Sequence, residues 1–424
     1  MACVRIVSLE YSQFENFAKY HPLNNYMQTY KYASLMSDIG FNFDFIGYQD
    51  DNGSLQAAAL ILTKKITGDT KYGYAPKGFL INYYDENLVK NFFKDLRKYY
   101  YEQNFIFIKF NPEIIIGQTD KEHKYEMSYN GNVRVIDILK EIGVKRRKEL
   151  YEFNNVLPRF NAYINLKNFS INSISRNYRK KIRKCVKTGM SLVLEDVKSI
   201  DKLYPMLKTK RDANYYKSFY NKFDMDNSID LLFVKVDFEK RLAYIRDEYN
   251  KEQQHNDECN RIIQTDPTPR NLNNKMASDK RLESFKNNII EATRELKKNS
   301  TAYVAGALVI KHFNRVSIIA SGYSEEFKSL NPNHFLYYAV CERYKPYFDF
   351  CDIGGVSGNF SDKSVYNGIN QFKLKWNPTV YEFIGEFDLI ISQRIFKKLI
   401  TTNYIENEFN QNLDHLDIKQ DNKK

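Results

Sequence analysis

A polar segment at residues 238–298 interrupts a series of strand and helix patterns, and it limits the folds that this chain can adopt. Its apolar residues recur every three or four positions, at Phe238, Leu242, Ile245 and Tyr249, then at Leu282, Phe285, Ile289, Ala292 and Leu296. This spacing fits the apolar seam between two packed helices. The prolines at 267 and 269 must end the first helix, because proline has no N–H to donate. We therefore predict an inserted antiparallel helical coiled-coil arm, with helices of roughly 40 Å at 1.5 Å per residue.

The segments on both sides of this insertion predict mixed α/β structure. Residues 41–66 contain two strand patterns around Asp51-Asn52-Gly53, which is a strong hairpin signal. An amphipathic helix pattern at 86–104 precedes a strand pattern at 105–112, and a second hairpin pattern spans 302–324. A hairpin, a helix and another strand in succession favour a mixed sheet.

The length of 424 residues exceeds the size at which one hydrophobic core keeps growing, so more than one domain is expected. The patterns divide the chain into four parts: a first α/β unit at 1–160, a second at 161–237 and 299–402, the arm at 238–298 and a polar C-terminal tail at 403–424.

Charge and cysteine usage limit the partners and the compartment. The net charge of +12 favours an anionic partner such as nucleic acid, a phosphate-bearing substrate or a membrane surface, although general lysine enrichment is an open alternative. The five cysteines form no C-x-x-C pair, which argues for a reducing compartment and against structural zinc. No signal peptide is evident, and no run approaches the roughly 18 apolar residues of a membrane span. We expect a soluble, cytoplasmic protein whose membrane contact, if any, is peripheral.

The densest charge lies in the segment from Arg176 to Lys187, which has seven cations in twelve residues and no acid. Three apolar residues fall on one face of the predicted helix, and the opposite face carries Arg176, Lys180, Arg183 and Lys187. This pattern indicates a surface for a polyanion, with an ordinary solvated face as the alternative.

A second conspicuous segment, residues 350–389, places a lysine among glycines and aromatic residues. Gly354 and Gly355 permit a tight turn or a close approach to a ligand. Lys373 lies between Phe372 and Trp376, an arrangement typical of contacts with phosphates or nucleic-acid ends.

Other common catalytic motifs are absent from the sequence. There is no G-x-x-x-x-G-K-[ST], no G-x-G-x-x-G, no H-E-x-x-H and no G-x-S-x-G. We therefore expect no metal and no cofactor.

The order of several motifs resembles the Fem-type (FemA/FemB/FemX) peptidoglycan-bridge aminoacyltransferases. The resemblance covers nearly the whole chain through Tyr26-Met27-Gln28-Thr29, the Tyr74-Ala75-Pro76-Lys77-Gly78 turn, the basic segment 176–189, Lys210-Arg211-Asp212 with Tyr215 and Tyr216, the DIGGVSG motif at 352–358, Tyr366-Asn367-Gly368, Phe372-Lys373 and Phe383-Ile384-Gly385-Glu386.

This resemblance implies two GNAT-like (acetyltransferase-like) mixed-sheet units, the second interrupted by the arm. It implies transfer of glycine, alanine or serine from aminoacyl-tRNA to the stem-peptide amine of lipid II or its UDP-linked muropeptide precursor. Pairing with a second copy or with a homologue is a further expectation. Two alternatives stay open: a tRNA-dependent transferase with another amine acceptor, and a non-catalytic RNA-binding scaffold.

By the same resemblance, Lys373 is the candidate catalytic cation, and Phe372 supports it by packing or stacking. Arg211 and Tyr215 are candidates for binding the acceptor, and the other candidate substrate-binding residues are Asn111, Gly354, Gly355 and Tyr366. The chain departs from many relatives at Asn111-Pro112, where they carry Asp-Pro. An asparagine cannot accept a proton as a general base, so we expect no catalytic carboxylate at that position.

Overall fold

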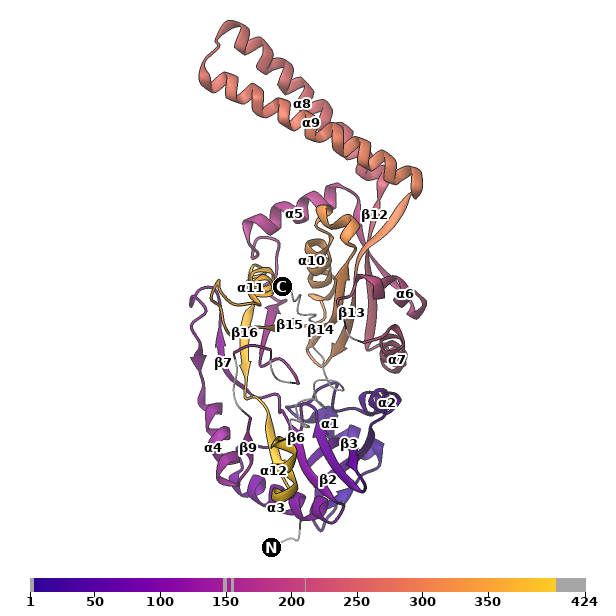
Figure 1. The fold of residues 1–424 in the computed structure, drawn as a ribbon, viewed down its shortest axis with the longest axis vertical. Coiled ribbons are helices and arrows are strands. Elements are labelled where there is room, and N and C mark those ends of the chain that lie inside the picture. The colour runs from indigo at the N-terminus through magenta and orange to yellow at the C-terminus, as the bar shows by residue number, and fades with distance from the viewer. Residues whose placement is uncertain (1–3, 148–150, 154–155, 210, 402–424) are drawn as a thin grey trace.

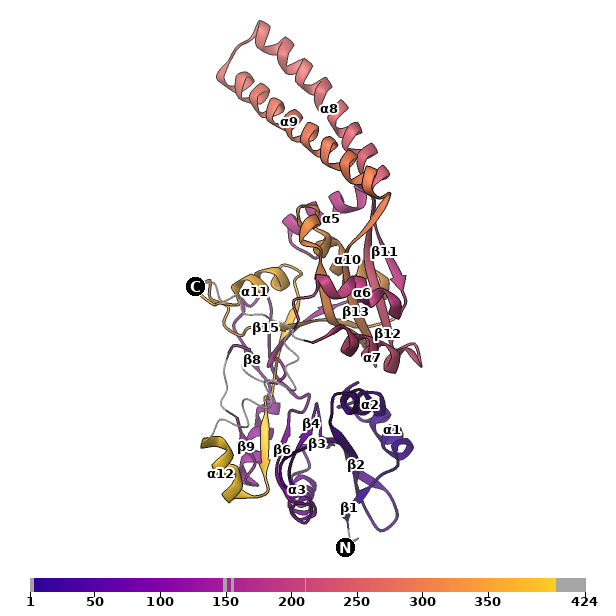
Figure 2. The same ribbon diagram turned by 45° about the vertical axis from the view of Figure 1, so that its right-hand side comes forward.

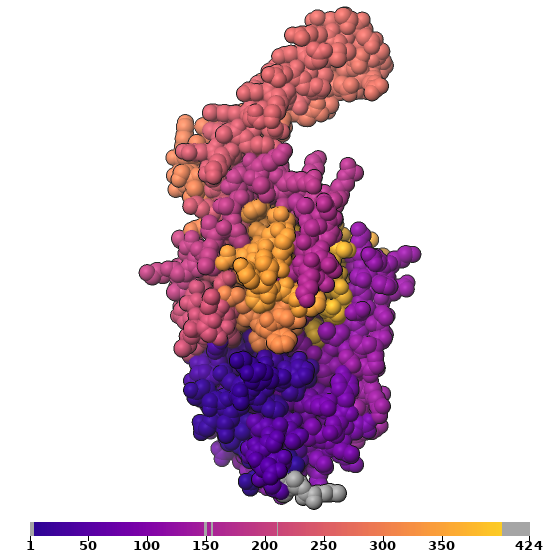
Figure 3. Space-filling model, turned by 180° about the vertical axis from the view of Figure 1, so that it is seen from behind, coloured from indigo at the N-terminus to yellow at the C-terminus, as the bar shows by residue number. Residues whose placement is uncertain are grey.

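The computed structural model describes residues 4–147, 151–153, 156–209 and 211–401. Its body consists of two β-sheets with helices packed on them, and a pair of long helices projects from one end (Figure 1). In the view from behind, the N-terminal part forms the end of the body that lies opposite the helical pair (Figure 3). The predicted tail at 403–424 lies outside the described residues. No described helix combines the length and the apolar composition that crossing a bilayer requires.

Within the described residues, the first sheet has eight strands in the order β1-β2-β3-β4-β6-β17-β9, with β5 paired to β3. Its strands are β1 (Arg5–Ser8), β2 (Asn42–Gln49), β3 (Leu55–Thr67), β4 (Thr70–Ala75), β5 (Leu80–Ile81), β6 (Phe105–Phe110), β9 (Lys145–Arg146) and β17 (Phe387–Ile390). β2 and β3 form the predicted antiparallel hairpin, whereas β4 and β6 are parallel, so the sheet is mixed as predicted.

The helices associated with the first sheet are α1 (Tyr11–Tyr20), α2 (Tyr30–Asp38), α3 (Glu86–Tyr101), α4 (Arg134–Glu141) and α12 (Gln393–Thr401). The predicted amphipathic helix is α3. Its N-terminus is capped by Asp85, which accepts a hydrogen bond from the N–H of Leu88 at 2.9 Å. Its apolar residues, spaced three and four apart, are buried against the sheet.

The second sheet has nine strands among the described residues, in the order β11-β12-β13-β14-β15-β10-β16-β7-β8. They are β7 (Ile115–Thr119), β8 (Ser128–Tyr129), β10 (Phe160–Asn165), β11 (Met190–Glu195), β12 (Ile229–Asp237), β13 (Thr301–His312), β14 (Arg315–Tyr323), β15 (Phe350–Val356) and β16 (Thr379–Phe383). The parallel β14–β15 pair makes this sheet mixed too. The accompanying helices are α5 (Arg176–Lys187), α6 (Ile200–Leu203), α7 (Ala213–Asp224), α10 (Pro332–Tyr344) and α11 (Asn367–Leu374).

The two sheets exchange strands across the boundary that we placed at residue 160. After β6 the chain leaves the first sheet, and β7 pairs with β16 of the second sheet. After β16 it returns, and β17 pairs with β6. The two segments that pass from one sheet to the other are in contact, because the N–H of Ile384 donates to the carbonyl of Ile114 at 2.8 Å. We placed the boundary at residue 160 from the order of strand and helix patterns along the chain. In the structure, by contrast, strands that are far apart in the sequence pair with one another (Figure 2).

The insertion at 238–298 forms two antiparallel helices, α8 (Phe238–Thr265) and α9 (Pro269–Lys298), with the predicted break between them (Figure 1). Near the body, Leu242, Ile245 and Ala292 are buried between the helices. Farther out, polar and apolar residues are both buried: Asn256 Nδ2 donates to Ser278 Oγ at 3.1 Å, and Cys259 and Leu282 are buried as well. The coiled-coil character of the pair remains a prediction.

Candidate active site

A cleft of about 1200 Å³ lies where residues of the two sheets and their loops meet. Both halves of the chain supply its charged side chains: Lys77, Glu113, Lys202, Lys208, Arg315, Glu325, Glu326, Asp352 and Lys373. Of the residues predicted from sequence, Lys373, Phe372, Tyr215, Gly354 and Gly355 line this cleft, whereas Asn111, Arg211 and Tyr366 lie outside its lining. Among the described residues there is no group of His, Cys, Asp and Glu side chains that could hold a metal ion.

Lys373 extends from α11 into the cleft. Its Nζ donates to the carbonyl of Gly355 at 2.7 Å. Burial lowers the pKa of Lys373 to about 8, against the opposing effect of the Asp352 carboxylate. The φ of Gly354 is +84°, and a Cβ there would lie 3.1 Å from the lysine Nζ. Glycine at this position therefore lets the backbone turn beside the ammonium group.

Phe372 packs in an aromatic group behind the lysine. Its ring lies 5.1 Å from that of Tyr337 and 6.3 Å from that of Trp376, between centroids. Its carbonyl accepts a hydrogen bond from the Tyr178 hydroxyl of α5 at 3.2 Å. Among the cation–ring contacts of the described chain none involves Lys373, so its ammonium meets a backbone carbonyl rather than an aromatic face. The sequence pattern did not predict this.

Glu113 provides a carboxylate in the cleft that the sequence did not lead us to expect. It follows Asn111-Pro112 by one residue and accepts from Arg315 Nη2 at 2.7 Å and from Asn25 Nδ2 at 2.5 Å. Burial alone would raise the pKa of Glu113, but the Arg315 and Lys77 cations lower it to about 2. The pair joins a loop that follows the first sheet to β14 of the second. A carboxylate so firmly ionised is a structural anion rather than a base at neutral pH.

The Glu113–Arg315 pair gives the first prediction. A folded-state pKa depressed from 4.5 to about 2 stabilises the protein above pH 4.5, and this stability is lost as the pH falls through 2. The shift corresponds to roughly 3 kcal/mol. We expect Glu113→Gln to remove this component, so that its unfolding free energy falls less than that of the wild type between pH 5 and pH 2. Glu86→Gln, at an exposed pair with Arg134, is the control. Parallel pH curves for the wild type and Glu113→Gln would contradict the prediction.

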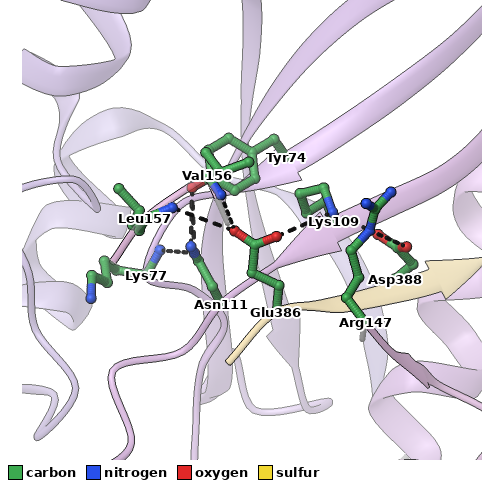
Figure 4. A network of polar contacts seen from close by, with 9 residues as sticks. All are labelled: Tyr74, Lys77, Lys109, Asn111, Arg147, Val156, Leu157, Glu386 and Asp388. Atoms are coloured by element: carbon green, nitrogen blue, oxygen red, sulfur yellow. Dashed lines mark hydrogen bonds and ion pairs between the residues drawn. The ribbon is translucent and has the colours of Figure 1, made fainter. Parts of the chain in front are cut away.

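Asn111 lies beside the cleft and shapes one of its turns. Its Oδ1 accepts the N–H of Lys77 at 2.9 Å, and its Nδ2 donates to the Tyr74 hydroxyl at 3.2 Å (Figure 4). The Lys77 ammonium, which lines the cleft, lies 4.4 Å from the centroid of the Phe383 ring, and burial lowers its pKa. In this structure Asn111 therefore orients the turn that carries Lys77; its contact with substrate remains a prediction.

A buried ionic network supports the cleft from the side of the first sheet. Lys109 Nζ lies 3.1 Å from Asp388 Oδ1 and 3.6 Å from Glu386 Oε2. Glu386 Oε1 also accepts the N–H of Val156 at 2.6 Å, and Leu157 next to it lines the cleft (Figure 4). The network thus links β6 and the start of β17 to a wall of the cleft.

The remaining substrate-binding candidates lie at two edges of the site. The guanidinium of Arg211 lies 4.7 Å from the centroid of the Tyr215 ring, so these two residues are brought together at the start of α7. The ring of Tyr366 packs edge-on against Phe153 at 4.8 Å. A Cβ on Gly355 would lie 2.6 Å from Pro158, so this glycine allows a close approach of protein segments.

Helix α5 has the predicted amphipathic arrangement. Tyr178, Ile182 and Cys185 are buried toward the body. The four basic candidates on the opposite face are exposed, and none has a carboxylate partner within 4 Å in the described part of the chain: Arg176, Lys180, Arg183 and Lys187. They lie outside the cleft lining, and α5 itself runs between the base of the arm and α11 (Figure 1).

The fold and the site together define a mixed α/β protein with two strand-exchanging sheets, a deep charged cleft at their junction and a projecting helical pair. The chain belongs to the FemAB family, whose model matches residues 9–403. It is 23% identical over 403 residues to a Lipid II:glycine glycyltransferase of Staphylococcus aureus, covering 91% of this chain and 92% of that protein. The solved structure described as FemX has a TM-score of 0.72 at 20% identity and covers 93% of this chain and 99% of that one. The chain therefore has the fold of that structure.

Proposed function

We propose that this chain is an aminoacyltransferase that moves an amino acid from aminoacyl-tRNA to the stem-peptide amine of a peptidoglycan precursor. The name of the S. aureus relative favours glycine as the transferred residue and lipid II as the acceptor. The observation that carries the proposal is the Lys373 ammonium, held in the cleft between the two sheets of a FemAB family member.

The chemistry of the proposed reaction suits this site. An aminoacyl ester is already activated, so no covalent nucleophile is required. The enzyme must hold an amine near the ester carbonyl and stabilise the oxyanion that forms when the amine attacks. Lys373 supplies a partly buried cation in the cleft, where its effect on a developing charge is greater than in water. Phe372 keeps that lysine in place through its aromatic contacts.

The acceptor and the donor are assigned to different surfaces. Arg211, whose planar group stacks on Tyr215, offers the paired donors that suit a phosphate of the acceptor. The exposed basic face of α5 is proposed to bind the tRNA backbone.

The proposed tRNA surface gives the second prediction. We expect replacement of Arg176, Lys180, Arg183 and Lys187 by glutamine to weaken tRNA binding and to reduce the slope of log Kd against log salt concentration by about 3, because each lost phosphate contact removes about 0.7–0.9. Filter binding at several salt concentrations measures this slope. The control removes the same charge elsewhere on the exposed surface, through glutamine at Lys90, Lys94, Lys121 and Lys140. An equal slope in both variants would contradict the assignment of α5.

A donor-by-acceptor assay tests the proposed function directly. Labelled glycyl-, alanyl- and seryl-tRNA are each incubated with lipid II, with a UDP-linked muropeptide and with amines unrelated to peptidoglycan. We expect transfer to a muropeptide amine. Transfer only to other amines, or tRNA binding without any transfer, would refute the proposal.

A further inference from the structure

Asp352 differs from the other carboxylates that line the cleft. Each of the other three has a cationic partner: Glu113 with Arg315 at 2.7 Å, Glu325 with Lys328 at 3.4 Å, and Glu326 with Lys298 at 3.7 Å. Within the described residues no cation lies within 4 Å of the Asp352 carboxylate. Its hydrogen bonds come from the N–H of Gly354 at 2.8 Å and from Asn161 Nδ2 at 3.2 Å. This half-buried carboxylate therefore faces the cleft, and no cation among the described residues is in contact with it.

Asn161 holds the Asp352 carboxylate through its amide nitrogen. Because a carboxylate only accepts hydrogen bonds, the amide of Asn161 must turn its nitrogen toward Asp352 and its oxygen away. That Oδ1 is buried and accepts no hydrogen bond from any residue that the structure describes. The β10–β15 register shifts after Asn161, where Gly354 takes a positive φ, and this irregularity brings Asn161 and Asp352 together. Both residues line the cleft.

A primary ammonium group fits the Asp352 carboxylate. It carries one positive charge and three N–H donors, whereas an anion or an uncharged carbonyl would meet only acceptors there. The Lys373 ammonium does not fill the position, because it donates to the carbonyl of Gly355. Burial raises the pKa of Asp352, with the Arg315 cation opposing that rise, so the carboxylate is a better proton acceptor than an exposed one. The titratable groups that face it from other elements are Arg315, Lys373, Glu113, Lys77, Tyr163 and Tyr26.

Building on the proposed function, we propose that Asp352 binds the ammonium of the acceptor and removes the proton that the amine must lose before it attacks. The first proton passes from nitrogen to the Asp352 carboxylate. The free amine then forms a C–N bond to the ester carbonyl, and the oxyanion lies toward Lys373. When the bond from carbon to the ribose oxygen breaks, the second nitrogen proton goes to that oxygen. The products are the amide and the free 3′-terminal hydroxyl, and Asp352 releases its proton to water.

The decisive experiment compares two acceptors with one variant. Asp352→Asn keeps the shape of the side chain and an oxygen for the N–H of Gly354, but it removes the charge and the base. With a muropeptide amine near pH 7, we expect transfer to fall at least 30-fold. With the same muropeptide carrying an aminooxy group, which is uncharged near neutral pH, we expect a fall of less than threefold. If the substitution affected folding or Lys373 in general, it would lower the transfer rates with both acceptors by the same factor. Such an effect therefore cancels in the ratio of the two rates. Equal losses with both acceptors would overturn the proposal.

A binding measurement separates this proposal from the proposed function. The probe is a soluble muropeptide with a free side-chain amine, compared with the same compound acetylated on that amine. We expect wild-type protein to bind the free amine at least tenfold more tightly, and Asp352→Asn to lose this preference. Preference without transfer from any aminoacyl-tRNA would sustain the ammonium site and refute the transferase. Transfer by wild type without any preference would refute the ammonium site alone.

Discussion

Replacement of Lys373 by methionine is expected to lower aminoacyl transfer about 100-fold or more, the usual consequence of losing one group that stabilises an oxyanion. Methionine preserves most of the length and the apolar stem of the side chain. Because the ammonium of Lys373 bonds only to the carbonyl of Gly355 and has no carboxylate within 4 Å in the described chain, its removal should leave the fold intact. We expect kcat and kcat/KM to fall together, since the interaction is made in the transition state.

The matched control is Lys375→Met, which removes an exposed cation two residues away on the same segment. Transfer of labelled amino acid from tRNA to a muropeptide gives the rates, and circular dichroism verifies the fold. If Lys373→Met transferred at the wild-type rate, Lys373 would have no part in the mechanism. If only KM rose, the lysine would bind substrate and not act on the transition state.

Replacement of Lys109 by methionine is expected to lower the free energy of unfolding by about 3–5 kcal/mol, as breaking a buried ionic network does. Lys109 is 1% exposed, and its loss leaves Glu386 (4% exposed) and Asp388 (2% exposed) close together without their shared cation. Asp388 keeps Arg147 at 3.1 Å, whereas Glu386 keeps only its backbone donors among its described contacts. Glu386 is therefore the group expected to suffer most.

Urea unfolding measures this effect, with Lys90→Met on the exposed face of α3 as the control. Adding Glu386→Gln to Lys109→Met should recover much of the loss, since glutamine removes the buried charge and can still accept the N–H of Val156. A loss below about 1 kcal/mol for Lys109→Met would contradict the buried network as a source of stability.

Local elements of this fold were predictable from the sequence, whereas the pairing of distant strands was not. Hairpins and helices were predictable because their signals are local: Asp51-Asn52-Gly53 sets a turn, and apolar spacing sets the buried face of α3. The exchange of β7 and β17 between the sheets was not predictable, because nothing in the sequence of either strand indicates which sheet it joins.

Some residues of the candidate site were likewise predictable from the sequence, and others were not. Lys373, Phe372 and Tyr215 were identified from motifs, and the structure places all three on one cleft. Asn111 was predicted not to act as a base, because an amide does not accept a proton near neutral pH. Glu113 was missed, although an acid directly after Asn111-Pro112 was a usable signal. Arg315 carried no signal, because its importance depends on a partner 202 positions away.

The amino-acid sequence by itself determined the mixed α/β class, the helical insertion, the basic face of α5 and the place of Lys373 in the series of Fem-type motifs. The first three features depend on spacing within a few residues, and the last depends on the order of short motifs along the chain; a chain displays both before it folds. Only the tertiary structure decided that Glu113 forms an ion pair with Arg315 and that Lys109 forms ion pairs with two carboxylates. It also decided that Asn161 turns its oxygen away from Asp352. Such contacts join distant segments, and their effects on charge and burial exist only once the two sheets have closed around the cleft.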